Sequence, residues 1–420
     1  MLPVIYRFTF STPGEKALLY FVALALVAYA AWSGWRTATS ITAAGVVGEP
    51  TRQDRVNRAL MYGLIGAVLA VVGLYYALPE VPILGKGKGE GVPIHTYGVL
   101  VGAGFITAVT VASWLALREW PGKLGLERRD QLFDMGFYAF VGAMVGSRVL
   151  FIIVNYKDYA AQPSKIFDLG GGLVFQGGLI GASLASYWYA KKNDIDFLRL
   201  SDLALPTVSL GQALGRLGCF SAGCCRGDIV GVGQKIGVHF PGLNATNLFG
   251  TLSSTPSLAY SEQIDDKRYV VEATGQVTHD AVAGSVQIAQ WVAQHGHTLP
   301  VHPTQLYESF GQIILFSAML LMRNYRRFHG QIAGMWLMCS AMLRTSVELF
   351  RGDVSRGTLH GFLEGLGLSA MAQRVPLEAW YNVSTGQFIS LCLFSLGAWL
   401  LISRSKTLKL PELTVVPQAA

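Results

Sequence analysis

Residues 211–227 read GQALGRLGCFSAGCCRG, a stretch that joins an apolar run to a charge, a set of glycines and three cysteines. The apolar run ends on Arg216, and Cys219, Cys224 and Cys225 follow it. A charge at the end of a membrane helix is costly to place, and by default it marks a functional site. The small residues around it allow another helix or a lipid headgroup to approach the backbone. The stretch therefore predicts a functional site at the end of a membrane-spanning helix.

Composition supports a membrane protein. The chain has 420 residues, of which 51% are hydrophobic and only 14% are charged, whereas soluble domains carry about 25% charged residues. Apolar runs near the length of a membrane span occur at residues 17–32, 59–78, 95–117, 131–155, 172–190, 200–217, 305–322, 331–350 and 387–402. We therefore predict an all-α polytopic membrane protein with about nine transmembrane helices.

The loop charges predict how the chain is oriented. Alternate loops are rich in Lys and Arg, as cytoplasmic loops are, and this pattern puts the N-terminus outside and the C-terminus in the cytoplasm. The arginines after the first run favour a retained helix over a cleaved signal peptide. The same loops account for the net charge of +7, and no separate basic domain suggests binding to nucleic acid. The polar stretch between the sixth and seventh spans is expected to form a small α+β insert on the outer side.

Four regions follow from this pattern. Residues 1–92 would form two N-terminal transmembrane helices with their loops, and residues 93–227 the first part of a membrane core. Residues 228–300 would form the extramembrane insert, in which KRYVVEA is strand-like and HDAVAGSVQIAQWVAQHG is helix-like. Residues 301–420 would form the second part of the core and a cytoplasmic tail.

Every unusual polar residue in or beside an apolar run is expected in one layer, at the outer ends of the spans. These residues are Tyr97, Gln176, Arg216, His302, Gln305, Glu308, Arg344, Glu348 and Arg351. Arg344 and Glu348 are four apart on a helix and can pair, which by itself is compatible with a purely structural ion pair. Alternatively, Arg216 and Arg344 hold a phosphate, because a guanidinium donates bidentate hydrogen bonds to phosphate oxygens. In a membrane that phosphate would belong to a phospholipid headgroup.

Neither the cysteines nor the histidines form a recognisable metal motif. No CxxC pair recurs at a zinc-like spacing, and His295, His297 and His302 have no fourth partner at a clear spacing, so no metal site is expected. Facing an oxidising compartment, Cys219 could form a disulfide with Cys224 or Cys225, whereas a bridge between those two adjacent residues would be strained.

Six motifs in order give the chain a family resemblance. They are Tyr97-Gly98, GGLVFQGGLIGA, SDLALP, GRLGCFSAGCCRG, HPTQLYES and RTSVELFRGD, within residues 93–404. Together they resemble the bacterial prolipoprotein diacylglyceryl transferases. The resemblance implies an inner-membrane enzyme with a seven-helix core that acts at the periplasmic leaflet. Such an enzyme moves the diacylglyceryl group of phosphatidylglycerol to the lipobox cysteine of a preprolipoprotein, releases glycerol 1-phosphate, and needs no metal or organic cofactor.

The resemblance also implies roles for individual residues. Arg216 and Arg344 match the family's key arginines, and Gln176 stands where the family usually has a catalytic histidine. The motif positions expected to bind substrate are Tyr97, Arg148, Gly177, Cys219, Cys224, Gly227, His302, Gln305, Glu308, Glu348 and Arg351. Cys219 and Cys224 replace the usual asparagine and glutamate, and Ser340 replaces a tyrosine. Gln176 can hydrogen-bond but cannot act as a general base.

Two other functions stay open at this stage. These departures are compatible with an enzyme of altered lipid or acceptor specificity, or with a lipid-binding protein that has lost catalysis. A transporter is disfavoured, because the ionisable residues gather at one leaflet instead of following a path through the bilayer.

Overall fold

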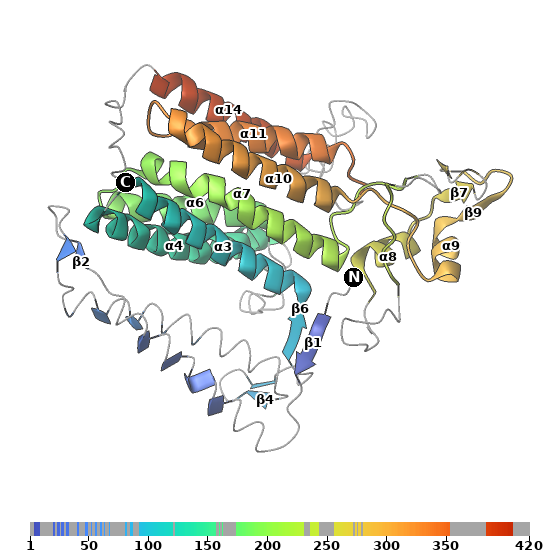
Figure 1. Cartoon of the computed structure of the whole chain (residues 1–420). Coiled ribbons are helices and arrows are strands. Elements are labelled where there is room, and N and C mark those ends of the chain that lie inside the picture. Colours follow the sequence, from blue (N-terminus) through green and yellow to red (C-terminus); the bar gives the residue numbers. More distant parts are fainter. Residues whose placement is uncertain are drawn as a thin grey trace, which may run out of the picture.

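The computed structural model describes a helical bundle with a small head at one end (Figure 1). It describes residues 92–120, 122–156, 174–230, 236–242, 256–271, 276–278, 280–352 and 384–405, with short or scattered segments before residue 92 and a few single residues between these ranges. Only scattered residues of the spans expected at 17–32 and 59–78 are among them, so those two predictions lie outside the described part.

In the described part, seven long helices occupy the apolar runs that were expected after residue 93. They are α3 (Thr96–Glu119), α4 (Lys123–Val154), α6 (Phe175–Lys192), α7 (Phe197–Ala222), α10 (Thr304–Met322), α11 (Gln331–Glu348) and α14 (Thr385–Ser405). Four of them are long and apolar enough to cross a membrane, namely α3, α4, α10 with the 3-10 turn η2 (Arg323–Tyr325), and α14.

The outer surface of the bundle is apolar. Large side chains such as Ile106, Ile153, Leu184, Phe310 and Leu391 are each more than half exposed. They come from five different helices, α6 among them, although α6 does not count among the four most apolar spans. Large exposed apolar side chains on five helices suit contact with lipid rather than with water. The prediction of a helical membrane protein is therefore confirmed, whereas the number of spans stays a prediction.

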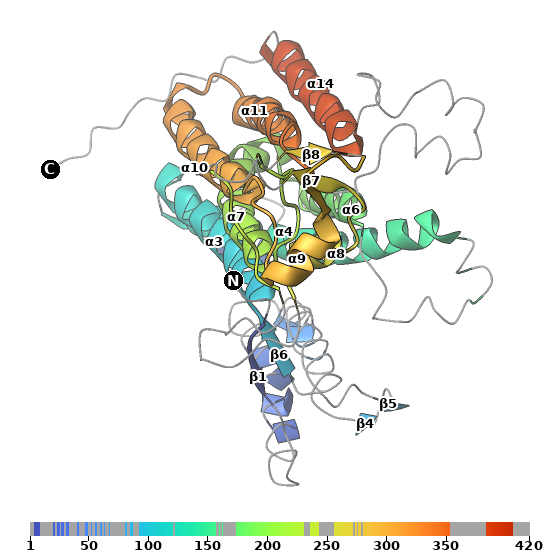
Figure 2. The same ribbon diagram turned by 90° about the vertical axis from the view of Figure 1, so that its right-hand side faces the viewer.

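Glycine contacts bring the helices close together. Helix α7 packs against α3, α10 and α11, while α4 packs against α6 and α11 against α14 (Figure 2). Between α4 and α6, a Cβ atom on Gly177 would collide with the carbonyl oxygen of Gly146, and one on Gly181 with that of Gly142. Glycines four residues apart on both helices therefore allow the two backbones to pack closely.

The expectation that all unusual polar residues share one layer was wrong. At the other end of the bundle, Arg323 and Arg326 both donate to Glu119, the latter over 2.8 Å. Nearby, the buried carboxylate of Asp202 accepts from the backbone N–H of Gly330 at 2.8 Å and of Ala333 at 2.9 Å. Asp202 thus satisfies the free N–H groups where α11 begins, and a buried carboxylate needs such donors.

The head has its own small core. In the described part it contains α8 (Leu258–Ile264), β7 (Tyr269–Val271), β8 (Val277–Thr278), β9 (Ser285–Gln287) and α9 (Ile288–His295). The strands form an antiparallel sheet in the order β8-β7-β9. Its core is made of Tyr260, Val270, Ile288, Val292 and Leu299. The predicted α+β insert is confirmed in these residues.

The helix-like prediction for residues 279–296 was only half correct. Its first part forms β9, because Val286 pairs with Val270 of β7, and the helix begins only at Ile288. Tertiary pairing overrides local propensity here.

Strands outside the head also depart from the all-α prediction. They are β1 (Val4–Phe8) paired with β6 (Val92–His95), β2 (Ser40–Ile41) with β3 (Val47–Gly48), and β4 (Glu80–Val81) with β5 (Gly85–Lys86). The β-branched residues of VIYRF and VPIH favour the longest of these pairs.

Candidate active site

Glu308 joins the two arginines that the sequence singled out. One carboxylate oxygen, Oε1, lies 2.9 Å from Nη2 of Arg216, and the other, Oε2, lies 3.1 Å from Nη1 of Arg344. Glu308 is 7% exposed, whereas the arginine side chains are 21% and 26% exposed. The carboxylate is therefore buried beneath two guanidinium groups that each keep an accessible edge.

A second carboxylate extends this network. Glu348 pairs with Arg344 at 3.1 Å, which confirms the predicted i,i+4 pair, and its Oε2 lies 3.7 Å from Arg351. Its other oxygen accepts from the hydroxyl of Ser384 at the start of α14. We call Arg216, Glu308, Arg344, Glu348 and Arg351 the arginine network.

Helix packing fixes the network at the head end of the bundle. Arg216 lies near the end of α7, Glu308 near the start of α10 and Arg344 near the end of α11, and these three helix ends meet beside the head (Figure 1). Ser309 donates to the backbone oxygen of Ala213 at 3.0 Å and locks α10 against α7 next to the Arg216–Glu308 pair.

The last turn of α7 and the three residues after it, 219–225, pack beside the network, and we call this segment the cysteine loop. Helix α7 ends at Gly223, whose φ of 72° allows the chain to turn back. The loop is fixed to the start of α10, because Gln305 donates to the Cys224 carbonyl at 2.7 Å and Thr304 to the Cys225 carbonyl at 2.8 Å. Gln305 thus holds the loop through its amide nitrogen. Tyr97, at the start of α3, packs against Gly218, next to the loop.

The three thiols are free and close together. No disulfide joins Cys219, Cys224 and Cys225 in the structure, and their Sγ atoms all lie within 4.8 Å of one another. Hydrogen bonds from the thiols of Cys219 and Cys224 lower the pKa of the Cys225 thiol. Among the described residues this is also the only group of three or more Cys, His, Asp or Glu side chains able to share a metal ion, so the three histidines do not converge.

Backbone hydrogen bonds fix Gly227, which follows the cysteine loop, against the start of α10 and the end of α11. The N–H of Gly227 donates to the carbonyl of His302 at 2.8 Å, and Gly227 forms a bridge with Arg351. A Cβ at Gly227 would lie 2.7 Å from the backbone oxygens of both His302 and Phe350, which explains why glycine stands there.

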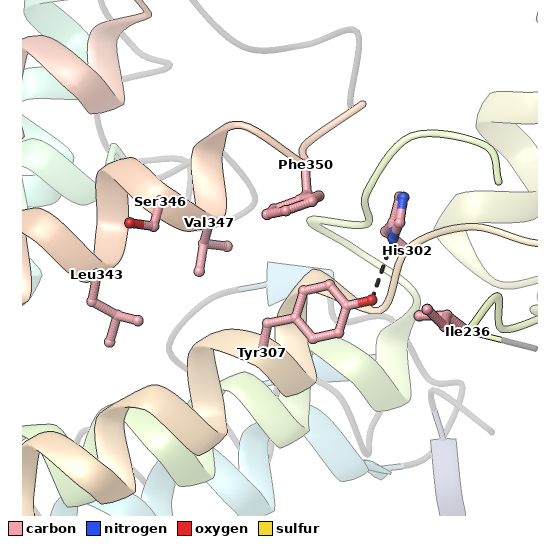
Figure 3. Close-up of a pocket in the computed structure, with 7 residues that line it drawn as sticks. All are labelled: Ile236, His302, Tyr307, Leu343, Ser346, Val347 and Phe350. Atoms are coloured by element: carbon pink, nitrogen blue, oxygen red, sulfur yellow. Dashed lines mark hydrogen bonds between the residues drawn. The ribbon is translucent and has the colours of Figure 1, made fainter.

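A shallow apolar pocket of about 340 Å³ opens next to these residues. Its lining comes from α10, α11 and the loops toward the head: Ile236, His302, Tyr307, Leu343, Ser346, Val347 and Phe350 (Figure 3). The Nδ1 atom of His302 lies 3.3 Å from the hydroxyl of Tyr307, and the two side chains point toward one another. His302 therefore links the pocket to the start of α10, which holds the cysteine loop.

Three predicted site residues form a separate group on α4 and α6. Arg148 lies over the rings of Phe151 and Tyr159, Gly177 packs on Gly146, and Gln176 is half-buried on α6. Within the part of the chain that the structure describes, the side chain of Gln176 makes no hydrogen bond. The structure therefore does not join Gln176 to the arginine network.

Two further features were missed by sequence reasoning. Arg226, in the GCCRG motif, is only 1% exposed and pairs with Glu262 of α8 at 3.2 Å, so it ties the loop to the head. The buried oxygens of Gln312 on α10 and Ser340 on α11 have no hydrogen-bond partner among the described residues. For Gln312 the sequence does contain a signal. Gln305, Glu308 and Gln312 are three and four residues apart, which places three polar side chains on one face of α10.

The network has the charge needed to bind an anion. Its three guanidinium groups and two carboxylates leave one net positive charge, in a setting where the arginines are partly exposed and the carboxylates are buried. Arginine is suited to phosphate because its planar group donates two parallel hydrogen bonds. The arrangement can hold a singly charged phosphodiester at the end of the bundle, beside an apolar pocket.

Comparison with known proteins shows the family of the chain. The prolipoprotein diacylglyceryl transferase family model matches residues 88–403. A phosphatidylglycerol–prolipoprotein diacylglyceryl transferase from Clostridium tetani is 28% identical over 263 residues, which cover 63% of this chain and 83% of the relative. The enzyme of the same name from Finegoldia magna is 28% identical over 265 residues, covering 63% and 81%. That from Bacillus cereus is 36% identical over 150 residues, covering 36% and 53%. This chain belongs to the prolipoprotein diacylglyceryl transferase family.

Proposed function

We propose that this protein transfers the diacylglyceryl group of phosphatidylglycerol to the lipobox cysteine of prolipoproteins, the first step of lipoprotein maturation. Besides membership of the family, the observation that supports this most is the sharing of Glu308 by Arg216 and Arg344. The pairing holds two phosphate-binding groups side by side at a helix end, where a phospholipid headgroup can reach them.

The reaction is a displacement at carbon. The acceptor thiolate attacks C3 of the diacylglyceryl group, the new C–S bond forms, and the C–O bond to phosphate breaks. Glycerol 1-phosphate leaves with the electron pair of that bond and so gains a second negative charge. Arg216 and Arg344 stabilise this charge as it develops, and such fixed donors are each worth about 10²–10³ in rate.

The carboxylates orient the arginines. Glu308 fixes one edge of each guanidinium, and Glu348 holds Arg344 from the other side. Arg351 adds a positive charge behind Glu348. Because the geometry is set before substrate binds, little reorganisation is needed during the reaction.

The apolar pocket is suited to the apolar part of a substrate. Leu343, Val347 and Phe350 offer a surface for an acyl chain or for the apolar side chains of a signal peptide. Burying such groups contributes about 25 cal/mol per Å².

We place the site at the periplasmic leaflet of the bacterial inner membrane, with the N-terminus periplasmic and the C-terminus cytoplasmic. This proposal rests on the positive-inside rule and on the described basic loops, between α3 and α4, α6 and α7, and α10 and α11, which lie at the bundle end away from the arginine network. Residues 93–227 and 301–420 would then form the membrane core, 228–300 the periplasmic head, and 1–92 two further helices with their loops.

A transferase of altered specificity is the second candidate. Cys219 and Cys224 replace the polar residues usual in the family. Cys219 follows Arg216 by one helical turn on α7 and is next to Gly218, which packs against Tyr97, and Cys224 lies close to Cys219, so both would contact a headgroup or an acceptor. The third candidate is a protein that binds lipid but has lost transfer activity.

The test is transfer by the purified protein in vesicles. Phosphatidylglycerol, cardiolipin and phosphatidylethanolamine are each offered with a peptide carrying one lipobox cysteine, and with a serine version as control. Thioether product from phosphatidylglycerol alone, with glycerol phosphate released, supports the proposal. Product from another lipid alone shows altered specificity, and lipid binding without product shows that catalysis is lost.

A further inference from the structure

The thiols of Cys219, Cys224 and Cys225 are closer together than the sequence spacing suggests. Their Sγ atoms lie within 4.8 Å of one another, and all three residues are partly exposed. Tetrahedral zinc with Zn–S bonds of about 2.3 Å holds its sulfur ligands about 3.8 Å apart. The side chains are therefore within a small rotation of a geometry that binds one ion.

The backbone is specifically shaped to gather them. Cys225 has a φ of 57°, and among the described residues only Asp194 shares a positive φ without being glycine. This conformation is unfavourable for a residue with a Cβ and persists only where the surroundings impose it. Here Thr304 holds the Cys225 carbonyl, and Gln305 holds that of Cys224. The strain brings two adjacent thiols toward Cys219 on the end of α7.

The set has three ligands and not four. Among the described residues, no fourth Cys, His, Asp or Glu completes the group. Structural zinc sites have four protein ligands, whereas catalytic sites have three and leave a position for water or substrate. Three thiolates with Zn²⁺ carry one negative charge, and Arg216, three residues before Cys219 on α7, offers the opposite charge.

The reaction of the proposed function needs a thiolate. Only the thiolate form of a cysteine is nucleophilic, and a thiol that coordinates zinc is deprotonated outright. The side chain at position 176 cannot take the proton, because it is the amide of Gln176.

We infer that Cys219, Cys224 and Cys225 bind a zinc ion whose fourth position takes the acceptor thiol. The inference rests on the proposed function and adds a means of activating the acceptor. Zinc held by these three thiolates would take the acceptor sulfur in place of a water or hydroxide ligand; that ligand would leave with the proton of the thiol, and the acceptor would be held as its thiolate. That sulfur then attacks C3 of the diacylglyceryl group, the C–O bond breaks, and glycerol phosphate leaves with the electron pair. Zinc changes neither its charge nor its oxidation state.

The first experiment measures the metal. The full-length protein is purified under reducing conditions, loaded with zinc, exchanged into metal-free buffer and analysed by mass spectrometry for metal content. We expect one zinc per chain, and less than a tenth of that in Cys219→Ser and Cys225→Ser. The matched control is Cys392→Ser, since Cys392 is an exposed thiol on α14. No retained zinc, or equal zinc in all variants, would overturn the inference.

The second experiment follows the fourth ligand. With cobalt in place of zinc, the thiolate-to-cobalt absorption should increase when a lipobox peptide with cysteine is added, and should stay constant with the serine peptide. An unchanged spectrum with the cysteine peptide would overturn the assignment of the acceptor. A disulfide among the three cysteines that persists under mild reductant, found by peptide mapping, would overturn the site itself.

Measuring transfer activity distinguishes a failure of the zinc inference from a failure of the proposed function. Loss of transfer on chelation, with recovery when zinc is returned, supports both. Full transfer by metal-free protein would overturn the role of zinc while the proposed function stands. Zinc binding and the cobalt response without any transfer would overturn the proposed function and leave the metal site standing.

Discussion

Arg216 at the end of α7 and Glu308 near the start of α10 form an ion pair with 2.9 Å between Nη2 and Oε1. The pair joins two helices that are separated by the whole head in the sequence. Because the other oxygen of Glu308 lies 3.1 Å from Arg344, a single buried carboxylate sets the spacing of two arginines. The account of the site depends on this relationship.

Glu308→Gln tests whether the carboxylate orients the arginines. We expect kcat to fall at least ~10-fold, because small displacements of positioned groups reduce rates strongly. Stability should fall by about 2 kcal/mol, less than for a fully buried pair because both arginines are partly exposed. Transfer kinetics and thermal unfolding measure the two effects.

The matched control for that change is Glu127→Gln. Glu127 is as buried as Glu308 but lies near the start of α4, and it accepts from Gln131. An equal loss of kcat in both variants would show that the effect on transfer is not specific to the arginine network.

Gln176→Ala tests the predicted catalytic role of Gln176. Since the structure does not join this side chain to the arginine network, we expect transfer to fall less than ~10-fold, whereas loss of a general base costs about 10²–10⁴. The wild-type rate should show no titration of a group at position 176. Gln176→His would introduce one near pH ~6.5, visible in the pH profile of kcat/KM. A hundredfold loss in Gln176→Ala would contradict this account and place α6 in the chemistry.

Gly177→Ala tests the contact between α4 and α6. The added Cβ would collide with the carbonyl oxygen of Gly146, so the helices must separate, at a cost of about 1–3 kcal/mol. Gly102→Ala on α3 is the control, because nothing lies within 4 Å of a Cβ there. Denaturant or thermal unfolding in detergent measures the difference, and equal stability of the two variants would refute the tight contact.

The stability of the head should depend on pH through Asp266. Burial acts to raise the pKa of Asp266, but hydrogen bonds from the side chain and backbone of Arg268 outweigh it and leave the pKa below its usual value. A carboxyl group with a lowered folded pKa stabilises the protein above its unfolded pKa of about 4, and this contribution is lost as the pH falls through the folded value. The protection of the β7–β9 amides, which is their exchange rate relative to that of an unstructured peptide at the same pH, should therefore fall below pH ~4. Asp266→Asn should remove this dependence, and an unchanged pH dependence in that variant would exclude Asp266 as its cause.

Some of the fold could be predicted because its signals are local. Spans such as 331–350 appear as long apolar runs, and the Arg344–Glu348 pair follows from helical spacing alone. The structure places α11 within that span, from Gln331 to Glu348.

Other features depend on packing between distant segments. The position of Glu308 between two arginines requires the meeting of three helices, which no spacing in the sequence shows. Asp202 lies at the start of the span predicted at 200–217, opposite to Arg216, but its contact with the N–H groups at the start of α11 depends on the packing of two helices, which sequence spacing does not show. The meeting of all three thiols depends on the backbone turn at Cys225, whereas the sequence suggested only a disulfide from Cys219 to one of the other two.

The most direct test of the central claim compares arginine variants in one assay. Purified Arg216→Ala, Arg344→Ala and Arg118→Ala are given phosphatidylglycerol labelled in its headgroup and a lipobox peptide, and released glycerol phosphate is counted. Arg118 is an exposed arginine on α3 that lies over Trp114, away from the arginine network. We predict at least a ~100-fold loss in the first two variants, with folding intact, and a rate near wild type in the third. Wild-type release by Arg216→Ala or Arg344→Ala would contradict the claim that these arginines hold the departing phosphate.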